Sequence, residues 1–347
     1  MINKYLVSPD KTVKEIIQYM EENILKAVLV VQDDRTLLGL FSLGDMRHFF
    51  LNGGKLSDLI TVAMNKDPIV FSSVLEVEMD KKNRELIIYP VINENRKVVN
   101  VFTNEEDRNS LNSGNKLSSV EVVIMAGGKG TRLYPYTKIL PKALIPIGDY
   151  TISERIINNF QQYGCNRFFM ILNHKAKMIK IYFEELEKDY QIEFEEETEF
   201  MGTGGGLALL KGKINNTFFL SNCDILINAD LECIYKTHKK EKNKITFVCA
   251  MKDMMIPYGI IETDSNGNIA EIKEKPEFSF LTNTGVYVIE PEVVEELNDK
   301  EFIHLPDIAK RYIAKGEKVG VFPIPEKSWM DMGQFNEMES MIKQLGV

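Results

Sequence analysis

The residues best suited to do chemistry lie in a glycine-rich segment at 125–133, Met-Ala-Gly-Gly-Lys-Gly-Thr-Arg-Leu. Three glycines in four positions let a ligand approach the backbone and offer N–H donors with no Cβ in the way. Arg132 adds a planar set of donors that suits phosphate oxygens. The pattern differs from G-x-G-x-x-G and lacks the Gly-Lys-Ser/Thr ending of a P-loop. It predicts a phosphate-binding loop of another type, against the alternative of a flexible strand–helix connection.

A run of basic residues continues from this loop. Between Gly127 and Gly148 there is no acidic residue and there are four basic ones, which are Lys129, Arg132, Lys138 and Lys142. Prolines at 135, 141 and 146 fix the path of the chain around Lys142 and would hold that lysine in place. The alternative is an ordinary surface lysine. The four histidines fall in no recognisable motif, and no Ser-His-Asp or Cys-His arrangement is evident.

The rest of the chain is acidic. The net charge is −9 over 347 residues, of which −2 falls on residues 1–119 and −7 on residues 120–347. A general nucleic-acid binder needs a broad basic surface, so that class is excluded. With 44% hydrophobic and 27% charged residues, the chain is of globular composition and long enough for about two domains. Four cysteines without a CxxC pair, no apolar run of membrane-spanning length and no signal-peptide core predict a cytoplasmic protein with reduced thiols.

The elements that must position the loop alternate between strand and helix patterns from residue 120 on. Short apolar runs predict strands, and amphipathic runs predict helices. The predicted strands are 120–125, 167–172, 217–223 and 245–250, the predicted helices are 153–163 and 177–189, and 258–263 with 269–274 form a predicted hairpin. Such alternation predicts a mainly parallel sheet covered on both faces. The acidic stretch 184–199 is interpreted as a solvated helix face and loop, with Glu197 as a possible exception.

The N-terminal part has its own, partly repeated pattern. A predicted helix at 12–22 precedes strands at 27–31 and 37–42 and a helix at 43–50, and strands at 87–92 and 97–103 repeat the strand pair. This repeat resembles a tandem pair of CBS domains, which bind adenine nucleotides in the cleft between copies. The family's Gly-x-x-Ser/Thr-x-x-Asp tail appears as Gly39, Ser42 and Asp45, so Ser42 and Asp45 are the implied CBS ligands. In the second copy Glu106 replaces the aspartate, which marks that copy as degenerate. The predicted division is 1–60 and 61–112 for the two copies, 113–119 for a linker and 120–347 for the larger domain.

The larger domain resembles the sugar-1-phosphate nucleotidylyltransferases. The segment AGGKGTRLYPYTKILPKALIPI looks like their signature, and further motifs follow in the family's order. These are Gly202–Leu207, Asn222-Cys223-Asp224, Tyr258-Gly259, Glu274-Lys275-Pro276, Asn283-Thr284-Gly285 and Trp329-Met330-Asp331-Met332-Gly333. The resemblance implies a Rossmann-like, mixed but mainly parallel α/β sheet preceded by the CBS pair.

Each motif carries an implied role. Arg132 would hold the leaving pyrophosphate, Lys142 would bridge the reacting phosphates, and Asp224 and Asp331 would hold one Mg²⁺, with Asp224 counted as catalytic. The implied nucleotide contacts are Ala126, Gly127, Gly128, Gly130, Thr131, Glu197, Gly202 and Thr203. The implied sugar-phosphate contacts are Gly259, Glu274, Lys275 and Asn283. Because the nucleophile is already an anion, no general base is expected, and catalysis would come from positioning and electrostatics.

The combination with a CBS pair is most similar to guanylyltransferases of bacterial surface and flagellin sugar pathways. It implies GTP and glucosamine-1-phosphate as substrates, for legionaminic acid type glycans, and a homo-oligomer without nucleic-acid or membrane partners. A carboxylate such as Glu197 suits guanine, whose N1–H and N2–H₂ are adjacent donors. Two departures stand out, Gly204 where the family has alanine and Cys223 where it has glycine. Mannose-1-phosphate guanylyltransferase, a thymidylyl- or uridylyltransferase and a non-catalytic nucleotide sensor remain alternatives.

Overall fold

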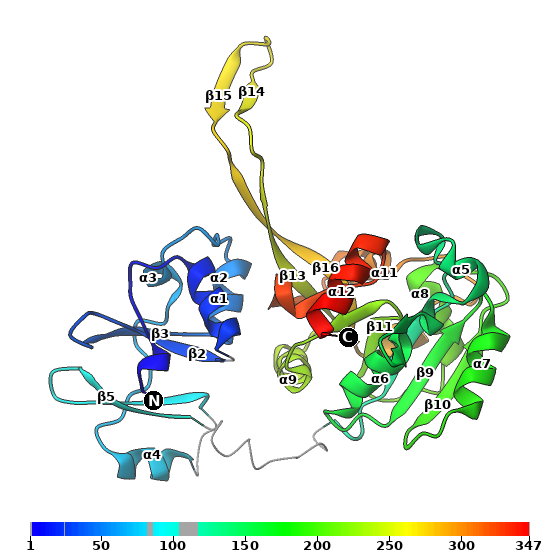
Figure 1. The fold of residues 1–347 in the computed structure, drawn as a ribbon, viewed down its shortest axis with the longest axis horizontal. Coiled ribbons are helices and arrows are strands. Elements are labelled where there is room, and N and C mark those ends of the chain that lie inside the picture. Colours follow the sequence, from blue (N-terminus) through cyan, green and yellow to red (C-terminus); the bar gives the residue numbers. More distant parts are fainter. Residues whose placement is uncertain (1, 24, 82–85, 104–116, 347) are drawn as a thin grey trace. The chain divides into compact units, whose positions relative to one another are not determined.

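The apolar runs of the C-terminal part form one seven-stranded sheet in the order β10-β9-β6-β11-β16-β13-β17 (Figure 1). The computed structural model describes residues 2–23, 25–81, 86–103 and 117–346. The strands are β6 (Val122–Ala126), β9 (Arg167–Leu172), β10 (Gln191–Glu196), β11 (Phe218–Asn222), β13 (Ile245–Met255), β16 (Glu277–Ile289) and β17 (Val319–Pro325). The pairs β10/β9, β9/β6, β6/β11 and β13/β17 are parallel, and β11/β16 is antiparallel. The expected mixed, mainly parallel sheet is confirmed.

Two layers of buried side chains cover the faces of this sheet, because successive residues of a strand point to opposite sides. Val122 and Ile124 of β6 belong to one core cluster, and Val123 and Met125 to the other. The helices of this part are α5 (Tyr136–Ile139), α6 (Ile152–Gln161), α7 (Ala176–Glu185), α8 (Gly202–Gly205), α9 (Leu231–Glu241), α10 (Pro291–Glu295), α11 (Leu305–Ala314) and α12 (Phe335–Leu345). Two short strand pairs also belong to this part, namely β7 (Pro146–Ile147) with β8 (Tyr150–Thr151), and β12 (Ile225–Ile227) with β18 (Trp329–Asp331).

One sequence expectation is wrong here. The acidic stretch 184–199 is not helix and loop throughout, because Gln191–Glu196 forms the edge strand β10. The residues alternate as Gln-Ile-Glu-Phe-Glu-Glu, and Ile192 and Phe194 pack against a core cluster while the acids face outward. An alternating pattern favours a half-buried strand. Charged residues on an edge strand also discourage pairing with other chains.

The chain divides into two compact units. The first holds residues Met1–Asn112 and Asp253–Ser279, and the second holds Ser113–Lys252 and Phe280–Val347. The predicted domain boundaries at 60, 112 and 119 stay predictions, and Glu106 and residues 113–116 lie outside the described residues. In the part of the chain that is described, no helix is long and apolar enough to span a membrane.

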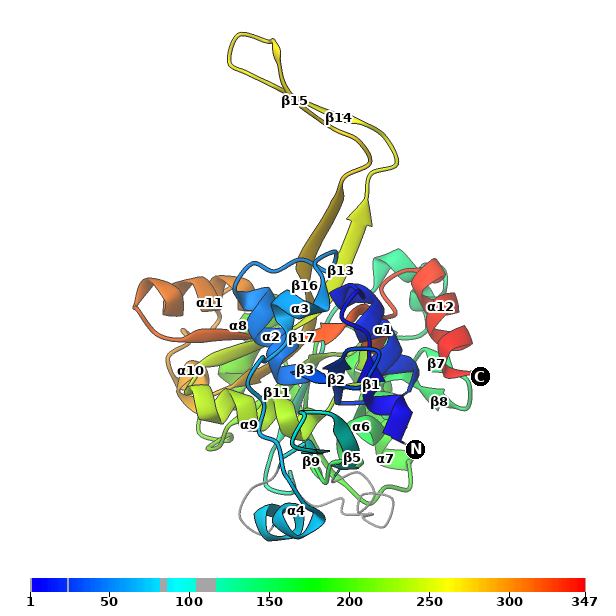
Figure 2. The same cartoon turned by 90° about the vertical axis from the view of Figure 1, so that its left-hand side faces the viewer.

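The first unit contains two small α/β arrangements. One has the sheet β1 (Leu6–Val7), β2 (Ala27–Val31) and β3 (Leu37–Ser42), with α1 (Val13–Glu22), α2 (Leu43–Leu51) and α3 (Ile60–Ala63) beside it (Figure 2). The other has the hairpin β4 (Ile88–Ile92) and β5 (Val98–Thr103) with α4 (Val74–Lys81). The predicted hairpin near residue 265 is present as β14 (Ile260–Thr263) and β15 (Ile269–Lys273).

Candidate active site

Four parallel strands end at the same edge of the sheet. Each of three of these strands is followed by a residue that the sequence predicts to be part of the site. Gly127 follows β6, Asp224 comes shortly after β11, and Glu197 follows β10. The fourth strand, β9, is followed by Asn173. Ligands of open α/β sheets bind at the carboxyl ends of parallel strands. Segments that are up to about a hundred residues apart in the sequence are therefore brought together at one edge.

The glycines of the 126–132 loop are required by close packing as well as by backbone freedom. A Cβ on Gly127 would lie 2.7 Å from Glu197 Oε2, and one on Gly130 would lie 2.9 Å from Thr137 Cγ2. Gly130 also has a φ of 63°, which favours glycine. At Gly128, by contrast, no described atom lies within 4 Å of a built Cβ. The loop is thus packed at both ends and open in the middle, as a loop that receives a ligand must be.

The cations around this loop fall into two kinds. Arg132 and Lys129 are exposed, and neither has an ion-pair partner among the described residues. Lys142 is only 10% exposed and forms an ion pair with Asp224, which is 15% exposed. Lys142 begins a short 3-10 turn that is held by Ser153 at the start of α6, whose hydroxyl donates to Ala143 O at 2.6 Å. Arg132 is therefore free to take an external anion, whereas Lys142 is fixed in place.

Strand pairing places Asp224 and Asp331 side by side. In the pair β12/β18, Ile225 stands opposite Asp331, and Met332 N donates to Asp224 O at 2.9 Å. Asp331 Oδ1 is buried and has no hydrogen-bond partner among the described residues. Burial and the nearby carboxylates of Asp224 and Glu337 raise the pKa of Asp331 to about 6. A divalent cation would supply the missing countercharge, so these two carboxylates fit Mg²⁺.

The described residues contain no group of three or more His, Cys, Asp or Glu side chains arranged to hold a metal. A cation between Asp224 and Asp331 would thus take its remaining ligands from phosphate oxygens and water, which is how Mg²⁺ commonly binds in nucleotide-dependent enzymes.

Replacing Asp331 with asparagine is expected to stabilise the metal-free protein above pH 6. The pKa of Asp331 is higher in the folded state than its ordinary value of 3.8, so its ionisation costs folding free energy as the pH rises from about 4 to about 6. The variant Asp331→Asn avoids this cost, and its Tm at pH 7.5 should exceed that of the unsubstituted protein by about 2–5 °C. At pH 4 the two values should coincide. A lower Tm for the variant at pH 7.5, measured by calorimetry in EDTA, would contradict the assigned environment of Asp331.

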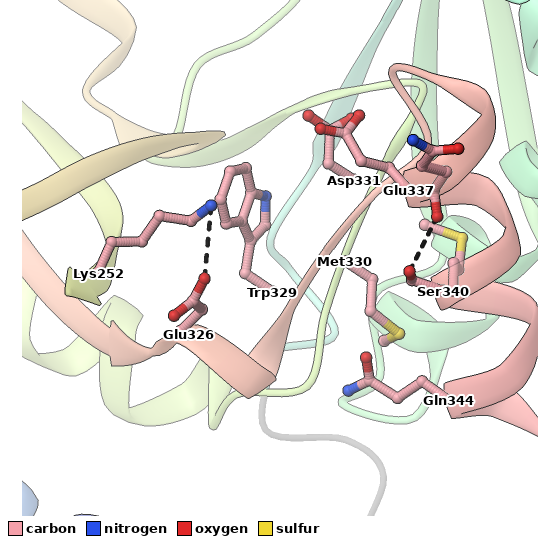
Figure 3. A pocket seen from close by; sticks show the side chains of 10 residues that line it. Lys252, Glu326, Trp329, Met330, Asp331, Glu337, Ser340 and Gln344 are labelled. Carbon is pink, nitrogen blue, oxygen red and sulfur yellow. Dashed lines mark hydrogen bonds and ion pairs between the residues drawn. The ribbon is translucent and has the colours of Figure 1, made fainter. Parts of the chain in front are cut away.

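A pocket of about 280 Å³ opens beside Asp331. Figure 3 shows Trp329 and Asp331 lining it from β18, Glu337 and Ser340 from α12, and Lys252 from β13. Lys252 Nζ lies 5.1 Å from the centre of the Trp329 ring and 3.4 Å from Glu326. Trp329 Nε1 and Glu337 Oε2 are buried without a hydrogen-bond partner among the described residues. The pocket thus offers an indole donor, a carboxylate acceptor and a cation to a polar ligand.

Glu197 lies between the two glycine-rich segments. It is 3% exposed, and burial raises the pKa of its carboxyl to about 7. A Cβ on Gly206 would lie 2.6 Å from Glu197 Oε1, just as one on Gly127 would approach Oε2. Oε1 accepts a hydrogen bond from Met201 N at 3.3 Å, whereas Oε2 has no partner among the described residues. The carboxylate therefore has one oxygen available.

Thr203 is held by the chain itself. Its hydroxyl lies 3.3 Å from His304 Nδ1 and accepts a hydrogen bond from Leu305 N, at the start of α11. Gly202 has a φ of 83°, and Gly204 N and Gly205 N donate to Ile303 O. His304 falls in no recognisable sequence motif, and its contact with Thr203 depends on the packing of α8 against α11, which no local pattern reveals.

The four predicted sugar-phosphate residues fall in two different compact units. Gly259, Glu274 and Lys275 belong to the first compact unit, where a Cβ on Gly259 would lie 2.9 Å from Glu274 Oε2. Asn283 belongs to the second unit, donates to the Tyr287 hydroxyl at 2.9 Å and accepts from Gly285 N at 3.1 Å. Their role as a group therefore stays a prediction.

Ser42 and Asp45 have a structural role in the first unit. Ser42 is the N-cap of α2, its hydroxyl and N–H donate to Asp45 Oδ2 at 2.6 and 2.8 Å, and Asp45 N donates back to Ser42 Oγ. This reciprocal arrangement is a capping box, which a Ser-x-x-Asp sequence favours whether or not a ligand binds. Whether these side chains also contact a nucleotide stays a prediction.

Comparison with known proteins agrees with this geometry. Residues 121–346 match the family described as nucleotidyl transferase, and residues 1–52 match the CBS domain. The chain belongs to the nucleotidyl transferase family. Within this family it is 32% identical to the bifunctional protein GlmU of Methanococcus aeolicus. The 209 aligned residues cover 58% of this chain and 49% of that protein.

Other relatives are named for different activities. A UTP–glucose-1-phosphate uridylyltransferase of Synechocystis is 27% identical, over 62% of this chain and 60% of the relative. A mannose-1-phosphate guanyltransferase of Aspergillus fumigatus is 28% identical, over 62% of this chain and 61% of the relative. The chain thus spans only half to three fifths of the length of these relatives. The crystal structure of HddC from Yersinia pseudotuberculosis has the same fold, with a TM-score of 0.51 at 21% identity over 65% of this chain and 99% of that one.

Proposed function

We propose that this member of the nucleotidyl transferase family transfers a nucleoside monophosphate from a nucleoside triphosphate to a sugar-1-phosphate. The observation that supports it most is the ion pair of Lys142 and Asp224 beside Asp331, at the strand edge that also carries the glycine-rich loop. This combination offers positive charge, cation ligands and backbone donors around one point. Such a site suits two phosphate groups that must react with each other.

In the proposed reaction an oxygen of the sugar-1-phosphate attacks the α-phosphorus of the triphosphate. The bond from that phosphorus to the bridging oxygen breaks, and pyrophosphate leaves with the electron pair. Arg132 would hold the leaving pyrophosphate, the 126–132 loop would receive the triphosphate, and Lys142 would contact the oxygens around the α-phosphorus. A Mg²⁺ ion held by Asp224 and Asp331 would supply further positive charge there. Because the attacking oxygen is already ionised, no side chain has to remove a proton.

GTP and glucosamine-1-phosphate are the proposed substrates. Glu197 supports guanine, because one carboxylate oxygen is free of intramolecular hydrogen bonds while the neighbouring glycines allow close approach. The pocket beside Asp331 supports an amino sugar, since Glu337 Oε2 has no hydrogen-bond partner among the described residues and would accept from an ammonium group. The relatives include guanyltransferases of mannose-1-phosphate as well as a uridylyltransferase, which makes the choice of base a matter for experiment.

The test is a matrix of four nucleoside triphosphates against glucosamine-, N-acetylglucosamine-, glucose- and mannose-1-phosphate. Pyrophosphate release is measured in Mg²⁺, and products are identified by mass spectrometry. We expect the highest kcat/KM for GTP with glucosamine-1-phosphate. If another pair of substrates reacts best, the proposed substrates are wrong but the proposed reaction stands. If no pair releases pyrophosphate, the proposed enzymatic function is excluded.

Replacing Glu197 with glutamine is expected to raise the KM for GTP by about 10-fold or more, because the negative charge of the carboxylate that would accept from the guanine N–H donors is lost. The pKa of Glu197 near 7 gives a second signature. As the pH falls from 8 to 6 the carboxyl becomes protonated, so the KM for GTP should rise in the unsubstituted protein and stay flat in Glu197→Gln. Steady-state kinetics at both pH values check this, and an equal change in KM for all four triphosphates would count against base recognition by Glu197.

For the first unit, we propose that an adenine nucleotide binds at the CBS region, which the match of residues 1–52 supports. Isothermal titration of the full chain with AMP, ADP and ATP in the absence of Mg²⁺ tests it, and no heat of binding would exclude it. Mass measurement by light scattering tests the proposed homo-oligomer.

A further inference from the structure

Lys175 has an unusual environment for a lysine. It immediately precedes α7 and adopts a φ of 57°, a left-handed conformation that side-chain-bearing residues rarely take. Its ammonium group donates to three backbone carbonyls, those of Thr137 at 3.1 Å, Lys138 at 2.6 Å and Ile139 at 2.9 Å. An ammonium has three N–H donors, so all of them are used. The ammonium group of this lysine is therefore surrounded by three carbonyl oxygens.

The three carbonyls belong to the end of α5, which has only one turn. The last carbonyls of a helix accept no hydrogen bond from the helix itself, and a single helical turn is too short to be stable by itself. A cation at this end satisfies the carbonyls and opposes the negative end of the helix dipole. Lys175 thus supplies, from another part of the chain, the hydrogen-bond donors and the positive charge that the end of α5 lacks.

α5 is in turn connected to the proposed catalytic groups. The hydroxyl of Thr137, which is 1% exposed, donates to Gly130 O at 2.8 Å. A Cβ on Gly130 would lie 3.3 Å from Lys142 Cβ, so the loop and Lys142 are packed against each other. Only Leu140 and Pro141 separate the end of α5 from Lys142. A displacement of α5 would move both the phosphate loop and Lys142.

The residues next to Lys175 contact the same site. His174 N donates to Gly127 O at 3.4 Å, and Asn173 Nδ2 donates to Glu197 O at 3.0 Å. Three consecutive residues after β9 therefore contact the start of the glycine-rich loop, the residue proposed to bind the base, and the helix that precedes Lys142.

We propose that Lys175 is a positioning residue, whose ammonium group acts as a built-in cation that fixes α5 and thereby places Lys142 and the glycine-rich loop for phosphoryl chemistry. Its kinetic consequences rest on the proposed function. The structural part, that the ammonium orders residues 137–145, does not.

The informative variant is Lys175→Gly, because glycine adopts a φ of 57° without strain and the substitution removes the side chain that carries the ammonium group. A loosened Lys142 should lower kcat by about 10- to 100-fold, with a much smaller change in the KM for the triphosphate. Because the vacated carbonyl ring can accept a small cation, ammonium or methylammonium chloride should restore part of the lost rate, whereas tetramethylammonium chloride should not. Lys242→Gly is the matched control, since Lys242 has the same φ of 57° at the end of α9 and no contact with α5 is recorded among the described residues. This control should keep kcat.

Hydrogen exchange of the full chain without substrate provides a readout independent of activity. The amides of residues 138–145 should exchange faster in Lys175→Gly than in the unsubstituted protein, and ammonium should slow them again. Lys175→Gln, which keeps two donors, should give an intermediate rate. Unchanged exchange in both variants would overturn the proposal, and so would a loss of kcat that ammonium and tetramethylammonium restore equally. An unsubstituted protein that transfers no nucleotide would overturn the proposed function but leave the exchange test intact.

Discussion

Replacing Lys142 with methionine is expected to lower kcat for nucleotidyl transfer by at least about 100-fold, with a smaller effect on the KM for the triphosphate. Lys142 is fixed by its ion pair with Asp224 and by the turn that follows it, so its charge is already in place before substrates bind. A preorganised charge stabilises the transition state at no cost of reorganisation. Methionine keeps the length of the side chain and its packing, so the fold should be retained. Single-turnover kinetics separate the chemical step from product release.

The control for Lys142→Met is Lys310→Met, which removes an equally large positive charge from an exposed position on α11. It should keep kcat within about 2-fold, since surface charge pairs of this kind contribute little. If Lys142→Met retained more than a third of the unsubstituted kcat, the charge of Lys142 would not act on the reacting phosphates.

Replacing Asp224 with asparagine is expected to have an equally large effect, a loss of kcat of about 100-fold or more, and to weaken binding of Mn²⁺ used as a probe for Mg²⁺. Asn keeps the shape of the side chain but removes the charge that pairs with Lys142 and that would face the cation beside Asp331. Because Lys142 and Asp224 are in contact, the double variant Lys142→Met/Asp224→Asn should lose less than the product of the two single losses. Electron paramagnetic resonance of free Mn²⁺ measures the affinity without reference to activity.

Asp149→Asn is the matched control for Asp224, since Asp149 is an exposed aspartate in the turn between β7 and β8. Its Mn²⁺ affinity and kcat should equal those of the unsubstituted protein. Normal Mn²⁺ binding by Asp224→Asn would mean that the cation is held elsewhere, even if kcat fell.

Secondary structure followed from the sequence wherever apolar runs were buried on both faces. The strand 167–172 was predicted with its observed bounds, and the bounds predicted for β6 and β11 differ from the observed ones by one or two residues. The edge strand β10 was missed, because its acidic residues masked the alternation of Ile192 and Phe194. The antiparallel strand β16 was missed as well, since its first half is largely exposed and only its second half is buried.

The candidate site divides in the same way. The sequence predicts the glycine-rich loop and Lys142 from local patterns, and Asp224 from the resemblance of its motif to that of the family. Lys175 and Glu337 were not identified, because their contacts arise only when β9 lies beside β6 and when α12 packs near β18. A lysine after a strand and a glutamate in the first turn of a helix are common in any sequence. Lys175 differs from an ordinary lysine in its contacts with three carbonyl oxygens. Glu337 differs from an ordinary glutamate in its position near the Asp331 oxygen that has no hydrogen-bond partner among the described residues.

The pairing of β12 with β18 has a consequence for synthesis of the protein on the ribosome. Asp224 is made more than a hundred residues before Asp331, and β18, the strand that aligns the two aspartates, emerges after β6, β9, β10 and β11. The glycine-rich loop and most of the parallel sheet can form earlier. The glycine-rich loop is therefore complete before the two aspartates can be aligned, and the proposed cation site would form only after β18 has emerged.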